Sequence, residues 1–226
     1  MKSYPPENFF HGTQLTLAQN IFDGDLNAVV ENAKKIDLNK PGKEDMTMLF
    51  YAFQAASDRK EIRFKIMSQL VRFGADPLQR VPDMGSVAGA AAHADSHLYM
   101  QSLIDGGMDP NTQIRDTPLI MMAADDDTIP TMNLLIEKGA DVNKRDSLGA
   151  TALMTALDGL QLDAVSWLLD NGADSRLTET NTGWSFSRQL FSIKKKIGGD
   201  KKVDVKLQEI IEKCVKQGME WPPTQK

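Results

Sequence analysis

The chain has 226 residues, of which 41% are hydrophobic and 25% are charged, and its formal net charge at pH 7 is -5. Mild acidity of this kind gives no general attraction to nucleic acid or anionic lipid, which both favour a basic face. The single cysteine, Cys214, excludes an internal disulfide and a cysteine-rich zinc site. No segment approaches the roughly 18 apolar residues of a membrane span.

The N-terminal part of the chain predicts a flexible segment followed by two degenerate helical units. Residues 1–14 begin polar and proline-rich, and we expect them to be flexible. The second repeat begins at Thr47 and closes at Gly74, and it is six residues longer than the corresponding stretch 151–172. The extra residues fall around 57–61, so the sequence predicts a longer turn between the two helices there.

A short signal then recurs at nearly constant spacing. It reads G-A-D-P at 74–77, G-M-D-P at 107–110, G-A-D-V at 139–142 and G-A-D-S at 172–175. The first residues of these signals are 33, 32 and 33 positions apart. A period of this size is typical of a stacked repeat array. Such arrays usually present an extended surface to another macromolecule, which makes an enzyme an unfavoured interpretation.

Each repeat predicts two helices with a turn between them. In the best copy, Thr151 is expected to cap the first helix with its hydroxyl, and Ala156 lets neighbouring helices approach closely. Leu168 and Leu169 belong to the buried stripe of the second helix. Gly172 ends that helix in a left-handed conformation. The loops between units are the predicted fingers, with short or absent strands, at about 40–46, 78–85, 112–116, 144–150 and 176–184.

The last unit opens at 183–186, is interrupted by the lysine-rich segment 194–202, and resumes as a helix near 203–217. We expect the lysines to form a solvated insertion, with contact to phospholipid or nucleic acid as the alternative. We expect Cys214, with its apolar neighbours, to be buried and inert. The sequence thus predicts an all-α solenoid of about six helix–turn–helix units with degenerate terminal caps and about 60% helix. One repeat domain would cover 15–220, followed by a tail at 221–226.

Three features could carry chemistry, and each has a simpler explanation. His93 and His97 are spaced like two metal ligands, but the period places His97 at a turn, so solvated polar groups are expected. The acidic run 125–127 lacks the glycine and distal glutamate of a calcium loop, which favours a solvated turn or an acidic patch for a partner. The segment G-W-S-F-S at 183–187 lacks the final glycine of a nucleophile elbow. We predict no catalytic residue, no metal site and no cofactor.

The candidate binding residues lie mostly on the fingers. Arginine and tryptophan are over-represented among residues that carry binding energy. Structural roles are the alternative for several positions, with Leu148 turning its hairpin and Trp184 covering the last repeat. The candidate protein-binding residues are Arg80, Met84, Arg115, Asp125, Asp126, Arg145, Leu148 and Trp184.

Over about 15–218 the repeats resemble the ankyrin family, most strongly in the middle three copies. A narrower likeness rests on P-G-K-E-D-M-T at 41–47, L-F-Y-A at 49–52, G-G-M-D-P-N at 106–111, R-D-S-L-G at 145–149 and W-P-P at 221–223. Together these resemble bacterial ankyrin proteins encoded beside phospholipase toxins of the type VI secretion system. The resemblance implies a non-enzymatic immunity protein, often exported as a lipoprotein, that binds and neutralises the cognate lipase effector.

The same resemblance implies a periplasmic location, with membrane attachment only through a lipid-anchored leader that has been removed from this chain. The polar, proline-rich start agrees with such a leader, and the cytoplasm is the alternative location. We expect a monomer when free, a protein partner and no nucleic-acid partner. The alternative function is a general ankyrin adaptor or regulator that binds a cytosolic bacterial protein.

Overall fold

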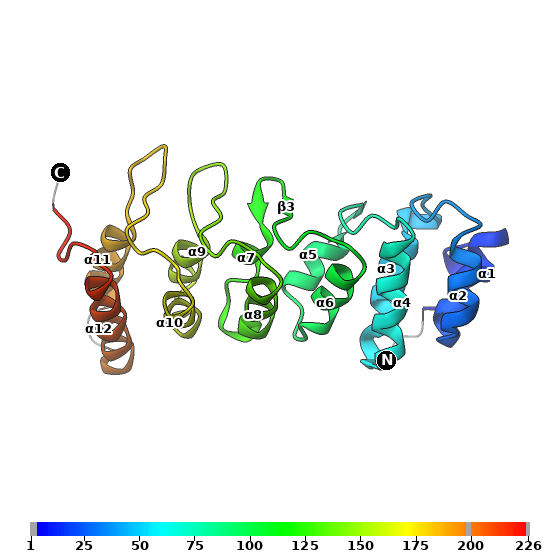
Figure 1. Ribbon diagram of the computed structural model, residues 1–226, viewed down its shortest axis with the longest axis horizontal. Coiled ribbons are helices and arrows are strands. Elements are labelled where there is room, and N and C mark those ends of the chain that lie inside the picture. The colour runs from blue at the N-terminus through cyan, green and yellow to red at the C-terminus, as the bar shows by residue number, and fades with distance from the viewer. Residues whose placement is uncertain (1–3, 198–199, 225–226) are drawn as a thin grey trace. The chain divides into compact units, whose positions relative to one another are not determined.

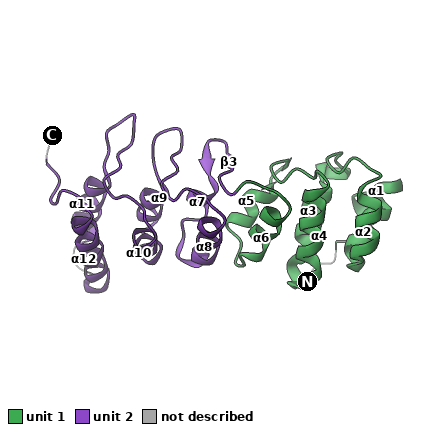
Figure 2. Ribbon diagram, viewed as in Figure 1, with its two compact units in different colours: residues 1–109 green, residues 110–226 purple. Residues whose placement is uncertain are grey.

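The computed structural model describes residues 4–197 and 200–224, and the chain divides into two compact units, 1–109 and 110–226 (Figure 1 and Figure 2). Each unit contains three pairs of α-helices in its described residues, which confirms the expected helix–turn–helix repeats. The α-helices hold about half of the chain, less than the expected 60%, because the fingers and inter-repeat turns are long. The prediction of one domain over 15–220 stays a prediction.

The first unit stacks its helices in two rows. One row is formed by α1, α3 and α5, and the other by α2, α4 and α6. The helices are α1 (Gly12–Asp23), α2 (Leu26–Ala33), α3 (Met48–Ala55), α4 (Glu61–Arg72), α5 (Val87–Ala92) and α6 (Leu98–Asp105). Short 3-10 turns occur at η1 (Pro6–Asn8), η2 (Lys43–Asp45) and η3 (Ala56–Asp58).

The second unit repeats this arrangement, with α7, α9 and α11 in one row and α10 against α12 in the other. Its helices are α7 (Leu119–Met122), α8 (Ile129–Glu137), α9 (Ala152–Asp158), α10 (Leu162–Asp170), α11 (Phe186–Ile197) and α12 (Lys201–Lys216), with the 3-10 turn η4 (Asp126–Thr128) before α8. The fold is therefore mostly helical, as the repeat period predicts.

The strands are confined to the fingers and are very short. In the second finger, β1 (Arg80–Val81) pairs with β2 (Gly85–Ser86). In the third, β3 (Gln113–Ile114) pairs with β4 (Thr117–Pro118), and the fifth has a single bridge between Thr178 and Ser185. This agrees with the expected short or absent strands.

The core consists of the faces that neighbouring helices turn toward one another. Small residues allow close packing: a Cβ added at Gly106 would lie 2.6 Å from the Cβ of Val71, so α6 approaches α4 closely at this point. The Leu168 stripe of α10 is buried, as expected. Large side chains below 2% exposure include Leu17, Ile21, Leu49, Met67, Leu70, Met100, Leu103 and Phe186.

The longer second repeat differs from its prediction. The turn between α3 and α4 covers five residues, 56–60, against three, 159–161, between α9 and α10. The turn therefore accounts for two of the six extra residues. The other four lengthen helices, because α3 has 8 residues against 7 in α9, and α4 has 12 against 9 in α10. Apolar burial by Phe64, Met67 and Leu70 explains why the added residues stay helical.

The predicted threonine cap is found in some repeats only. The Oγ1 of Thr47 accepts the N–H of Phe50 at 3.1 Å, and the Oγ of Ser86 accepts that of Gly89 at 3.3 Å. Thr151, the N-cap residue of the best copy, makes no side-chain cap bond to α9. The capping role is therefore confirmed for Thr47 and wrong for Thr151.

Asparagines link each repeat to the next one in three places. The Nδ2 of Asn143 donates to the carbonyl of Gly172 at 3.1 Å, while its Oδ1 accepts the N–H of Asp174 at 2.8 Å. Asn39 and Asn111 make the same pair of bonds to the following repeat. At the equivalent position of the second repeat stands Leu78, whose side chain has no hydrogen-bonding atom. We call this paired contact the asparagine clamp.

The N-terminal end of the described chain packs against α3, and the C-terminal end packs against α11. The rings of Phe10 and Tyr51 meet edge to face at 5.5 Å, and the hydroxyl of Tyr51 donates to the carbonyl of Tyr4 at 2.9 Å. At the other end, Trp221 packs against Phe191 with ring centroids 6.0 Å apart. Residues 1–3 of the N-terminal segment and 225–226 of the tail lie outside the described residues.

Candidate protein-binding surface

The predicted binding residues divide between the two units. Arg80 and Met84 belong to the first unit, and the other six belong to the second. The second finger is therefore described with the first unit, and the third, fourth and fifth fingers with the second.

The second finger exposes two large apolar side chains. Leu78 and Met84 are each 40% exposed, and Arg80 is exposed beside the buried anchor Val81. The sulfur of Met84 accepts a weak hydrogen bond from the Nε2 of Gln54 on α3 at 3.7 Å. The Oε1 of Gln54 is buried and has no hydrogen-bond partner among the described residues.

The third finger presents Arg115 at its tip. The register of β3 and β4 leaves Arg115 and Asp116 as the two turn residues, with φ values of 49° and 67°. Two positive φ values are what a type I′ hairpin turn needs. Arg115 is exposed, and no carboxylate in the described chain lies within ion-pair distance of its guanidinium. The tight turn thus holds a free positive charge away from the helices.

The third, fourth and fifth fingers are joined to one another by hydrogen bonds to backbone carbonyls. Gln113 donates from its Nε2 to the carbonyl of Arg145 at 3.2 Å, and Arg145 donates from Nη1 to the carbonyl of Thr178 at 3.3 Å. The carbonyl of Leu148 accepts both the N–H of Thr180 at 3.0 Å and its Oγ1 at 3.1 Å. Arg145 is half-buried and links the third finger to the fifth, so it has a structural role.

Two apolar side chains project from these joined fingers. Leu148 is 55% exposed and Trp184 is 41% exposed. Leu148 contributes its backbone carbonyl to the contact with Thr180, while its side chain is exposed. We call Arg115, Leu148 and Trp184 together the finger surface of the second unit. It combines a cation with an aliphatic and an aromatic side chain on a hydrogen-bonded support.

The two predicted acidic residues make internal contacts instead of pointing freely outward. The Oδ1 of Asp125 accepts the N–H of Asp127 at 3.0 Å. The Oδ1 of Asp126 accepts the N–H of Ala164 at 2.7 Å, so Asp126 caps α10 of the following repeat. The N–H of Asp126 also donates to the Oε1 of Gln161 at 3.2 Å. Asp127 is the exposed carboxylate of this turn.

The other residues with metal-binding or reactive groups lie apart. His93 follows α5 and His97 precedes α6, so the two do not share a helix. Among the described residues, no group of three histidine, cysteine, aspartate or glutamate side chains could hold a metal ion. Cys214 is buried, as expected, and burial raises the pKa of its thiol to about 11. None of the helices the structure describes is long and apolar enough to cross a membrane.

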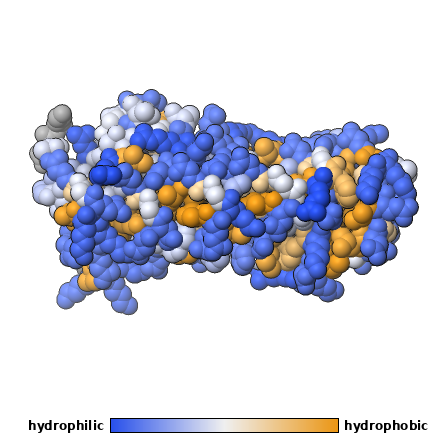
Figure 3. Space-filling view, viewed as in Figure 1, coloured by the Kyte–Doolittle hydropathy of each residue, from blue (hydrophilic) through white to orange (hydrophobic). Residues whose placement is uncertain are grey.

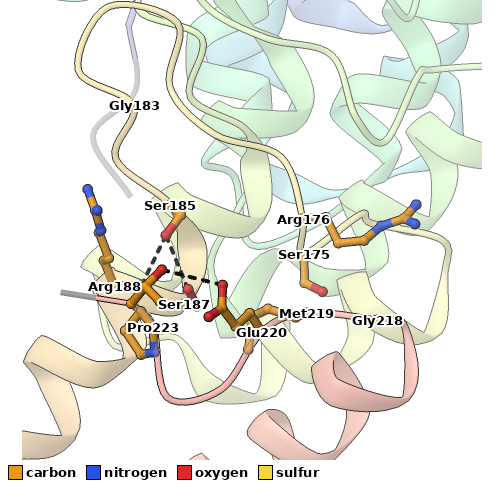
Figure 4. A pocket seen from close by; sticks show the side chains of 11 residues that line it. Ser175, Arg176, Gly183, Ser185, Ser187, Arg188, Gly218, Met219, Glu220 and Pro223 are labelled. Carbon is orange, nitrogen blue, oxygen red and sulfur yellow. Dashed lines mark hydrogen bonds between the residues drawn. The ribbon is translucent and has the colours of Figure 1, made fainter. Parts of the chain in front are cut away.

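A polar hollow of about 360 Å³ lies near the C-terminal end of the second unit (Figure 4). The Oγ of Ser185 lies 3.1 Å from that of Ser187 and accepts the N–H of Arg188 at 3.3 Å. The Oε2 of Glu220 accepts from Thr224 at 3.5 Å. No histidine lines the described part of this hollow. Ser185 stands at the start of α11, where the repeat pattern places it.

Sequence reasoning missed two kinds of residue. Leu78 was not predicted, although its departure from the asparagine of the other repeats is visible in the sequence. The cap from Asp126 to Ala164 has no local signal, because the partners are 38 residues apart.

Comparison with known proteins identifies the repeat. Residues 87–179 match the family described as ankyrin repeats, in three copies. Human ankyrin repeat and SOCS box protein 6 is 32% identical over 111 residues, which cover 45% of this chain and 26% of that protein. Ankyrin repeat and SAM domain-containing protein 6 of Rattus norvegicus is 35% identical over 140 residues, 58% of this chain and 15% of that protein. This chain thus matches about a quarter or less of the length of these relatives.

Solved structures agree on the fold. The ankyrin repeat domain of Bcl-3 superposes with a TM-score of 0.67 at 20% identity, covering 91% of this chain and 86% of that one. An ankyrin repeat domain from Acinetobacter baumannii AYE gives a TM-score of 0.62 at 20% identity, covering 90% of this chain and 98% of that one. Similarity at this level of identity concerns the fold alone.

Proposed function

We propose that this chain, which is an ankyrin-repeat protein, binds another protein through its fingers and catalyses no reaction itself. The observation that carries the proposal is the finger surface of the second unit. Leu148 and Trp184 are exposed large apolar side chains on a support fixed by hydrogen bonds, and Arg115 stands free at a tight turn. A finger backbone that is already fixed loses little entropy on binding, and aromatic and arginine side chains are over-represented among residues that carry binding energy.

We further propose that the partner is a type VI secreted phospholipase and that this chain is its immunity protein. The support is the narrower resemblance, and two of its segments lie at structurally defined places. R-D-S-L-G at 145–149 makes up most of the fourth finger. The last residue of G-G-M-D-P-N at 106–111 is Asn111, which forms an asparagine clamp. Binding would cover the entrance to the lipase active site or hold the enzyme in an unproductive state. A periplasmic location, reached through a removed lipid-anchored leader, belongs to the same proposal.

Enzyme inhibition tests this proposal. The chain is mixed with the lipase encoded beside its gene, and hydrolysis of a phospholipid substrate is followed. We expect inhibition that saturates at one chain per lipase, and weaker inhibition by Arg115→Glu, which reverses a free charge without removing an internal contact. Lys216→Glu, an exposed lysine on α12 and outside the fingers, is the matched control. Absence of both binding and inhibition would reject the lipase as partner.

A general adaptor is the second candidate. It is favoured by the curated relatives, whose names combine ankyrin repeats with a SOCS box or a SAM domain. On this alternative the same fingers bind a cytosolic bacterial protein. A gene neighbourhood without a lipase, together with capture of a defined cytosolic protein that Arg115→Glu no longer binds, would favour the adaptor.

A further inference from the structure

The free end of the last helix pair carries a dense group of lysines in an otherwise acidic chain. Two of them have internal partners: the Nζ of Lys194 lies 2.8 Å from the Oδ1 of Asp204, and that of Lys206 lies 2.5 Å from the Oδ1 of Asp163. Four others are exposed, and among the described residues no carboxylate lies within ion-pair distance of them. We call these four the lysine tip: Lys195, Lys196, Lys201 and Lys202.

Helix stability explains only half of the lysine tip. Lys195 and Lys196 lie in the last turn of α11, where positive charge favours the helix dipole. Lys201 and Lys202 are the first two residues of α12, where positive charge opposes the dipole. The carboxylate of Asp200 caps this end by accepting the N–H groups of Lys202 and Val203. The side chains of Lys201 and Lys202 therefore weaken the helix that carries them.

An apolar side chain stands beside these lysines. Val205 is 58% exposed, the largest exposed fraction of any large apolar side chain in the described chain. It follows Lys201 by four residues and Lys202 by three, so the three share one face of α12. At the lower end of the C-terminal helices, Figure 3 shows a small hydrophobic area between protruding hydrophilic chains.

We propose that the lysine tip and Val205 dock the chain on an anionic phospholipid surface. Four lysines without internal partners supply the charge complementarity, and each basic residue near such a surface strengthens binding about five-fold. Val205 can enter the headgroup layer, where an apolar side chain is favoured. The group contains no arginine and no aromatic residue, which nucleic-acid surfaces normally combine with lysine. The proposal concerns lipid alone and does not depend on the proposed lipase partner.

Sedimentation with vesicles tests the inference on the full chain without any partner protein. One set of vesicles is phosphatidylcholine, and the other is two parts phosphatidylcholine to one part phosphatidylglycerol. We expect binding to the anionic set only, with most of it lost near 1 M salt, where the Debye length falls to about 3 Å. Lys201→Gln with Lys202→Gln should weaken binding roughly 30-fold. Its thermal midpoint should stay equal or rise, because two charges that oppose the dipole are removed.

The matched control is Lys40→Gln with Lys43→Gln, which makes the same change in charge at exposed positions of the first unit. We expect its vesicle binding to match that of the unmodified chain. Equal binding to the two vesicle sets, or an equal loss in both variants, would overturn the inference. Binding to a DNA duplex without binding to anionic vesicles would also overturn it, by assigning the lysine tip to nucleic acid. A drop in thermal midpoint for the tip variant would show that the lysines are structural.

Discussion

At the scale of single residues, the fourth and fifth fingers depend on one position that only glycine fits. Gly149 has a φ of 87°, and a Cβ added there would lie 2.2 Å from the Oγ1 of Thr180 and 2.5 Å from its backbone nitrogen. That contact lets the carbonyl of Leu148 accept two hydrogen bonds from Thr180. The exposed side chain of Leu148 is thus held in place through its neighbour.

Replacing this glycine should separate steric conflict from backbone strain. Gly149→Ala is expected to lower the free energy of unfolding by about 2–3 kcal/mol, because it adds a clash to a left-handed conformation. Gly139→Ala is the matched control: its φ is 97°, but an added Cβ would meet nothing within 4 Å. The control should cost only about 1 kcal/mol. Urea denaturation of both variants measures the difference, and equal losses would contradict the close contact with Thr180.

The buried thiol makes a second prediction at this scale. Burial raises the pKa of Cys214 to about 11, so the thiol stays protonated in the folded chain at pH 8. A disulfide reagent added at pH 8 should react slowly with the native chain and rapidly in denaturant. Stability should also decline as pH rises above about 9, because the thiol then ionises in the unfolded chain but not in the folded one. Rapid reaction of the native chain would contradict the burial of Cys214.

At the scale of elements, each repeat is joined to the next by a few polar contacts that span about 30 residues. The asparagine clamp is one such contact, and the cap that Asp126 provides to α10 is another. The G-A-D signal shows where each second helix ends, so the pairs and their order could be predicted from sequence. The partner of Asp126 could not be predicted, because no local pattern marks a residue whose hydrogen bond lies in the next repeat.

The asparagine clamp predicts a loss of stability when Asn143 is replaced and a gain when Leu78 is replaced by asparagine. Asn143→Ala should destabilise the second unit by about 1–2 kcal/mol, because it removes one donor and one acceptor. Leu78→Asn should stabilise the first unit by up to about 1 kcal/mol, because it places an amide where the other repeats have one. Asn143→Asp, which keeps the acceptor and loses the donor, should fall between Asn143→Ala and the unmodified chain. Thermal unfolding monitored by circular dichroism measures all three.

The same thermal midpoints could also contradict a stabilising role of the asparagine clamp. If Asn143→Ala left the midpoint unchanged, the clamp would contribute nothing measurable to repeat stacking. If Leu78→Asn lowered the midpoint, Leu78 would be contributing apolar contact that an amide cannot replace.

At the scale of the whole molecule, repeat stacking makes stability a sum of local terms and leaves the fingers free to vary. The fold class follows from a period of 33, 32 and 33 residues, and the degenerate outer repeats follow from the helix and turn signals that flank it. The sequence predicts which residues lie on the fingers. It does not predict the hydrogen bonds and turns that hold these residues in position. The sequence cannot show that the backbone carbonyl of Leu148 accepts hydrogen bonds from Thr180. Nor can it show that Arg115 occupies a two-residue turn. These details depend on packing between fingers about 30 residues apart.

The central claim is that the finger surface of the second unit binds the partner protein. Calorimetric titration with the lipase encoded beside the gene tests it most directly, using Leu148→Ser with Trp184→Ser against the control Leu160→Ser. Leu160 is 46% exposed but lies in the turn between α9 and α10, away from the finger sequences. The account predicts binding at least about 30-fold weaker for the finger variant, equivalent to about 2 kcal/mol, and unchanged binding for the control. Unchanged binding by a folded finger variant would contradict it.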